Sequence, residues 1–266
     1  MAFNQNELIL DKVRSLTAHD LSNGEMLFRL TSLEDPSLNC TAEGEEVTDA
    51  VGALITTLYR AKKATFSASN SLLSLDLAAA QFGTKKEIAS ATGAIIVPTY
   101  EVIPVSDAGT ITLAKTPVGE ISYIYELVNG GIATRYSQTP AGGGEEGVKY
   151  FSIADNVITV PDGVTGKIYV EYEYESKGED KNGANRVVNK TSEFPEACSM
   201  KIYAYFRDKC NENLVYSGVI VANKAKLNPE SIELALTSTG KHAFEFQMMR
   251  DYCDEEAELF SIIVAE

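Results

Sequence analysis

Alternation of apolar and polar residues with a period of two constrains the fold of this chain more than any other feature. Side chains of a β-strand point to opposite faces in turn, so this period predicts strands with one buried and one wet face. It is clearest at 167–175, whose predicted buried face consists of Ile168, Val170, Tyr172 and Tyr174. The opposite face would carry Lys167, Glu171, Glu173 and Glu175.

Similar runs recur at 54–60, 201–207 and 244–248, whereas strong helix signals are few. Strands at this density favour antiparallel sandwiches or barrels over a parallel α/β sheet. The sequence therefore predicts a mostly β protein, a β-sandwich or barrel with one short packed α-helix and an inserted β-rich region.

The stretch 47–83 is predicted to form a strand, a basic turn, a second strand and that helix. Residues 54–60 alternate as a strand, Ala61, Lys62 and Lys63 interrupt the pattern, and 64–69 resume it. We expect the two strands to pair as a hairpin with the lysines at its tip, while the acidic stretch 33–46 is expected to be a loop with one short strand around 39–42.

A roughly helical apolar spacing follows at 72–82. Asn70 or Ser71 could cap this helix, and Gly83 could end it in the left-handed conformation. We expect Leu72, Leu75 and Ala79 to be buried against the sheet.

The middle of the chain is predicted to be a separate insertion. Asn129-Gly130-Gly131 predicts a tight hairpin turn, and Pro161-Asp162-Gly163 predicts another between strands at 157–160 and 167–175. We expect a tube-like β domain formed by 1–98 and 185–266, with 99–184 as an inserted, β-rich and Ig-like region.

Charge and cysteine spacing restrict the classes of function. The formal net charge is −15, which disfavours a surface that neutralises phosphates. The four cysteines form no CxxC pair, so we expect no zinc site and reduced thiols. No apolar run approaches the roughly 20 residues that span a bilayer, and the first residues lack a secretory pattern, so we expect no membrane partner.

No catalytic constellation emerges from the sequence. His19 and His242 are the only histidines, and neither accompanies a local nucleophile signature. The glycines at 142, 144 and 147 match GxGxxG, but they lack the strand–helix context of a dinucleotide site. We therefore expect no enzyme activity, no cofactor and no metal.

Several segments together resemble the tail tube (major tail) proteins of tailed bacteriophages. They are LITTLYRAKKATFSASNSLLSLDLAAAQFG, TITLAKTPVG, GKIYVEYEYES, SMKIYAYFRDK and KLNPESIELALTSTGKHAFEFQMMRDY. The resemblance covers about 20–95 and 185–266. It implies a structural subunit of the virion tail whose copies form stacked hexameric rings around a DNA-conducting channel, assembled in the host cytoplasm.

The resemblance also implies partners. The main one is the chain itself, with tape-measure, sheath, tail-terminator or baseplate proteins as further partners, while DNA passes without specific binding. Candidate subunit-interface residues are Leu58, Tyr59, Lys62 and Lys63. Two alternatives stay open: another virion component (capsid, decoration or baseplate), and a surface- or carbohydrate-binding β-sandwich module, favoured by the tyrosines.

Overall fold

The chain divides into two compact units, of which the second interrupts the first. The computed structural model describes residues 7–140, 147, 149–178, 183–209, 211, 213–230, 232–234, 237, 240–252 and 258–265. The first unit comprises Met1–Lys86 and Val187–Glu266, and the inserted unit comprises Glu87–Arg186. The predicted insertion, 99–184, lies within the second of these.

The first unit is one antiparallel sheet that curls into a nearly closed, barrel-like shape. Its strands are β1 (Leu8–Asp20), β2 (Met26–Leu30), β3 (Leu33–Thr48), β4 (Leu54–Asn70), β14 (Ala197–Asp208), β15 (Val215–Leu227), β16 (His242–Met248) and β17 (Ser261–Ala265). The order is β2-β1-β14-β15-β16-β4-β3, and β17 also pairs with β15. The protein is therefore mostly β, as predicted.

Alternation along the strands places the core of the first unit on the concave side. Phe244, Phe246 and Met248 on β16 are all buried, as their spacing predicts. Phe66 on β4 and Phe28 on β2 pack against this row, with ring centroids 6.3 Å from Phe244 and from Phe246 respectively. Aromatic rings contribute large buried areas, so this row is the centre of the unit's packing.

The predicted helix exists but is shorter. Helix α1 (Leu75–Phe82) begins after Ser74, whose hydroxyl accepts a hydrogen bond from the Leu77 amide, and it ends at Gly83 with φ 70°. The cap is thus not at Asn70 or Ser71. Leu72 precedes the helix and is exposed, so its predicted burial is wrong.

The packed face of α1 is also rotated from the predicted one. Leu75 is exposed, whereas Ala79 is buried together with Leu77, Ala78 and Gln81. The packed face is centred on the buried residues at 77, 78, 79 and 81, and Leu75 lies at the exposed first turn of the helix.

A buried polar pair joins α1 to β16. The His242 Nε2 lies 2.6 Å from the Gln81 Oε1, and the Gln81 amide nitrogen donates to the Ala243 carbonyl at 3.0 Å. Burial lowers the pKa of His242, because the apolar surroundings disfavour the imidazolium. Burial therefore favours the neutral imidazole, whose Nε2–H can donate to the Gln81 Oε1.

The inserted unit contains a seven-stranded sheet and a short two-stranded one. The strands of the larger sheet are β6 (Ile95–Pro104), β7 (Thr110–Thr112), β8 (Tyr123–Val128), β9 (Gly131–Gln138), β10 (Tyr150–Ala154), β11 (Val157–Thr159) and β12 (Lys167–Ser176). The order is β6-β12-β8-β9-β10-β11-β7, and β5 (Glu87–Ile88) pairs with β13 (Asn185–Arg186). Ile124, Phe151 and Ile168 are fully buried in its core.

Two hairpin predictions for this unit had different outcomes. The β8–β9 hairpin forms, with Asn129 and Gly130 at φ 52° and 82°, as a type I′ turn requires. The predicted 157–160/167–175 hairpin is wrong, because β11 pairs with β10 and β7 while β12 pairs with β6 and β8. The predicted buried face of β12 is nevertheless correct at Ile168, Val170 and Tyr172.

Candidate subunit interface on the β3–β4 arm

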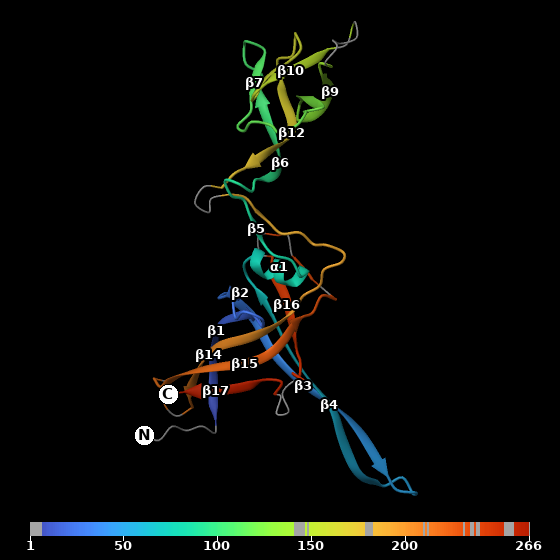
Figure 1. Ribbon diagram of the computed structural model, residues 1–266, viewed down its shortest axis with the longest axis vertical. Helices are drawn as coiled ribbons and strands as arrows, with labels where there is room; N and C mark the ends of the chain where they lie inside the picture. Colours follow the sequence, from blue (N-terminus) through green and yellow to red (C-terminus); the bar gives the residue numbers. More distant parts are fainter. Residues whose placement is uncertain are drawn as a thin grey trace. The chain divides into compact units, whose positions relative to one another are not determined.

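Strands β3 and β4 continue beyond the sheet as a two-stranded ribbon, which we call the arm (residues 39–63). Figure 1 shows this ribbon extending from the rest of the first unit. The change occurs at Ala64: from there to Asn70, β4 pairs with β16 on one side and β3 on the other, whereas residues 54–63 pair with β3 alone. The predicted loop at 33–46 is thus a long strand, and the predicted turn at 61–63 is wrong.

A β-bulge explains why the strand passes through the basic triplet. Ala61 has φ 51°, and the register shifts between Thr41 and Glu43 on the opposing strand. A residue in the left-handed region within a strand is typical of a bulge, which bends and twists the strand without ending it. Lys62 and Lys63 therefore lie at the base of the arm instead of its tip.

The turn at the tip is closed by Asp49. Its carboxylate accepts hydrogen bonds from the Val51 and Ala53 amides at 3.0 and 2.7 Å, and Gly52 takes φ 84°. Such side-chain bonds to nearby amides stabilise a tight turn. The tip is thus an ordered loop that presents Val51 to solvent.

The arm exposes an unusual number of large apolar side chains. These are Val47, Val51, Leu54, Ile55, Leu58 and Tyr59. They occupy both faces of the ribbon, since Ile55 and Tyr59 alternate with Leu54 and Leu58. A two-stranded hairpin alone is marginally stable in water, and several large apolar side chains exposed close together favour an interaction site.

Charged pairs cross the arm between the apolar residues. Arg60 lies 3.3 Å from Glu45, and Lys63 lies 2.9 Å from Glu43. All four side chains are exposed, so these pairs contribute little to stability. They place opposite charges at defined positions along the ribbon. A partner with complementary charges would then be favoured in one register.

The four predicted interface residues all lie on the arm and are all exposed. Leu58 and Tyr59 stand in the distal part, and Lys62 and Lys63 line a shallow groove of about 920 Å³ at the bulge, together with Arg250. Ile55 and Val51 were missed as interface candidates, although the alternation at 54–60 already placed apolar residues on both faces.

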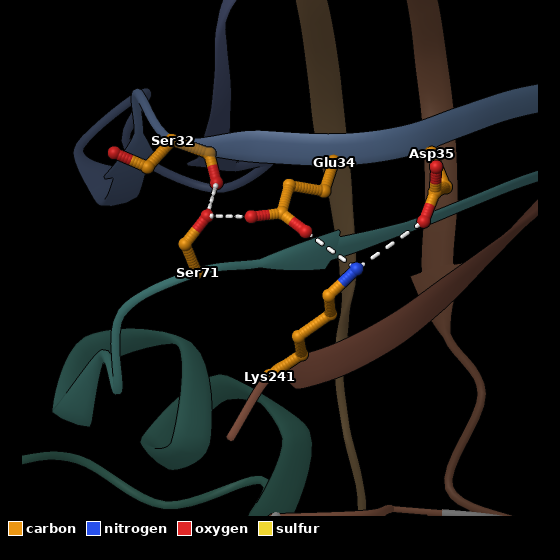
Figure 2. A network of polar contacts seen from close by, with 5 residues as sticks. All are labelled: Ser32, Glu34, Asp35, Ser71 and Lys241. Carbon is orange, nitrogen blue, oxygen red and sulfur yellow. Dashed lines mark hydrogen bonds and ion pairs between the residues drawn. The ribbon is translucent and has the colours of Figure 1, made fainter. Parts of the chain in front are cut away.

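A polar clamp lies at the end of the β3–β4 pair that is remote from the arm (Figure 2). The Lys241 ammonium lies 2.5 Å from the Glu34 carboxylate and 3.4 Å from that of Asp35. The Ser71 hydroxyl donates to the other oxygen of Glu34 at 2.5 Å and also contacts the Ser32 carbonyl at 3.2 Å. The clamp thus joins residues at the start of β3, the end of β4 and the start of β16.

The clamp also changes the acidity of its members. The hydrogen bond from Lys241, followed by that from Ser71, lowers the pKa of Glu34, and the same contact with Glu34 raises the pKa of Lys241. Both groups therefore stay charged across the neutral range, and this end of the β3–β4 pair keeps its ion pair there.

Metal binding and membrane insertion depend on side-chain clusters and on helix length in the part of the chain that the structure describes. There, no group of three or more His, Cys, Asp or Glu side chains could hold a metal ion. No helix among the described residues has the length and apolarity to cross a membrane. The glycines at 142 and 144, part of the GxGxxG match, lie outside the described residues.

Comparison with known protein families identifies a match. No curated protein matches the chain. A family model described as YomU/Tube protein family matches residues 8–262, which covers nearly all of both units. The chain therefore belongs to the YomU/Tube protein family.

Proposed function

We propose that this chain is a structural, non-enzymatic subunit of a bacteriophage tail tube. In this proposal, copies form hexameric rings that stack around a DNA-conducting channel in the virion tail, after assembly in the host cytoplasm. The family match supports a tube protein. The observation that carries the proposal is the arm, with its six exposed large apolar side chains on a ribbon with no other partner strand among the described residues.

The arm is the proposed contact with a neighbouring copy. Leu58 and Tyr59 would pack on that copy, and Lys62 and Lys63 would face its acidic surface, since the chain carries a net charge of −15. In this proposal each arm contacts the next copy around the ring without a reciprocal contact, which makes the interface heterologous. Heterologous contacts produce rings when their rotation closes.

A free strand edge supports the same conclusion. In the described part of the chain, β17 pairs only with β15, and Ile262 and Ile263 are exposed. Unpaired edges readily accept a strand from another chain. Pairing across subunits would continue the barrel-like sheet of the first unit around a ring.

The remaining components of the proposal follow from charge and organisation. An acidic wall would let DNA pass with little adhesion and without specific binding. Residues 1–98 and 185–266 would form the tube domain, and 99–184 an inserted Ig-like domain. Tape-measure, sheath, tail-terminator or baseplate proteins would be further partners, with no membrane involved.

Electron microscopy of the purified chain tests the proposal. Negatively stained samples should contain six-fold rings or hollow tubes, because the arm and the free edge would be satisfied only by other copies. Analytical ultracentrifugation over a wide concentration range should detect the same growth. A chain that remains monomeric at the highest concentration reached would refute the proposal.

A further inference from the structure

The inserted unit carries a row of tyrosines across three neighbouring strands. Tyr100 on β6, Tyr169 on β12 and Tyr125 on β8 lie on the face opposite the buried Ile168 and Val170. The Tyr100 and Tyr169 ring centroids are 5.6 Å apart, and those of Tyr169 and Tyr125 are 6.3 Å apart. Tyr100 ends the row and is 64% exposed, so one face of its ring is available to a ligand.

Tyr100 also forms a wall of a groove of about 710 Å³. The segment 118–121 forms another part of its lining, held to β12 by a 2.7 Å hydrogen bond from the Val118 amide to the Glu173 carbonyl. Beneath lies Tyr172, which is buried and whose hydroxyl donates to the Glu101 carboxylate. The groove is therefore built on packed strands, and its shape does not depend on a free loop.

Three carboxylates line this groove without a cation. They belong to Glu120, Glu171 and Glu173, and no lysine or arginine is among the described lining residues. Glu171 accepts a hydrogen bond from the Tyr169 hydroxyl, which holds it beside the aromatic row. A ligand with hydroxyl or ammonium donors would satisfy these acceptors, whereas an anionic ligand would be repelled.

We propose that this groove binds a pyranose ring of a polysaccharide that contains amino sugars. A pyranose has one apolar C–H face, which suits the free face of Tyr100. Its rim carries hydroxyl donors for the glutamates, and a protonated amine adds charge attraction and cation–π contact. A basic peptide would use the carboxylates but has no flat apolar face to match the tyrosine, so the sugar fits the whole groove better.

This binding function goes beyond tube assembly and is tested separately from it. Isothermal titration of the full chain with a glucosamine pentamer, at a mildly acidic pH that keeps its amines protonated, should give saturable binding. Tyr100→Ala should weaken it by about tenfold, the usual effect of losing one good aromatic contact. Glu171→Gln should weaken binding of the glucosamine pentamer more than that of the N-acetylated pentamer.

Controls separate the sugar site from general electrostatics. Tyr123→Ala, at an exposed tyrosine of the same unit that does not line the groove, should bind as the wild type does. Absence of sugar binding, or unchanged binding by Tyr100→Ala, would overturn the proposal. So would a lysine pentapeptide that binds as tightly as the sugar and competes with it. Thermal unfolding of each variant verifies that the unit is intact.

Discussion

Replacing two apolar residues of the arm should block assembly while leaving the subunit folded. In the isolated subunit Ile55 is 65% exposed and Leu58 is 43% exposed. Neither contributes much to the monomer's core, so Ile55→Thr with Leu58→Thr should change its unfolding free energy by less than about 1 kcal/mol. Threonine is chosen because it keeps a high strand propensity.

The effect on assembly follows from these exposed fractions. Fully burying such a side chain contributes roughly 1.5–3 kcal/mol. Scaled by the part still exposed, the two residues together offer about 2 kcal/mol to each contact with a neighbour. Because each added subunit makes one such contact, the critical concentration for polymerisation should rise about 30-fold.

Pelleting assays across a concentration series, with electron microscopy of the pellets, measure this shift. The matched control is Ile132→Thr with Val128→Thr, since Ile132 is 67% exposed but lies in the inserted unit. The control should polymerise at the wild-type concentration. An unchanged critical concentration for the arm variant, with normal thermal unfolding, would show that these side chains do not join subunits.

Three further changes test other parts of the first unit. Lys62→Glu with Lys63→Glu should raise the critical concentration without altering thermal unfolding; normal tubes would remove the lysines from the interface. Lys241→Met should leave Glu34 without its cation and speed amide hydrogen exchange at the start of β3 and the end of β4, and unchanged exchange would mean that the clamp does not stabilise this end of the strands. Burial lowers the pKa of His242 below the usual histidine value of about 6.5, so near that pH the unfolded chain binds more protons than the folded one. Stability is then fully present above that pH and falls as the pH drops below it. Urea titrations should detect this slope in the wild type and a weaker slope in His242→Gln, whereas equal slopes would refute the assignment.

The fold class and the faces of strands were predictable because they depend on local alternation. The buried positions of β12 and β16 follow directly from period-two patterns. Strand pairing was less predictable, as the β11–β12 hairpin illustrates: a good turn sequence joins two strands that pair elsewhere. Turn chemistry permits a hairpin, but packing of the core decides which strands are neighbours.

The arm escaped prediction for two physical reasons. The glutamates at 43, 45 and 46 have low strand propensity, yet all three pair in register with β4 across the ribbon. The Ala61 bulge resembles a turn in the sequence but lets β4 continue. The His242–Gln81 contact joins residues 161 positions apart, and no local pattern could reveal it.

Because one unit is inserted within the other, the two units become able to fold at different times during translation. All strands of the inserted unit come from the continuous stretch Glu87–Arg186, so it can fold as soon as that stretch leaves the ribosome. The sheet of the first unit must wait, because β1 pairs with β14, as in the match of Ser15 with Tyr203. Closing so long a loop is slow. A chain that stops before β14 therefore lacks β14, β15 and β16, and β16 is the strand that pairs with β4 next to the arm.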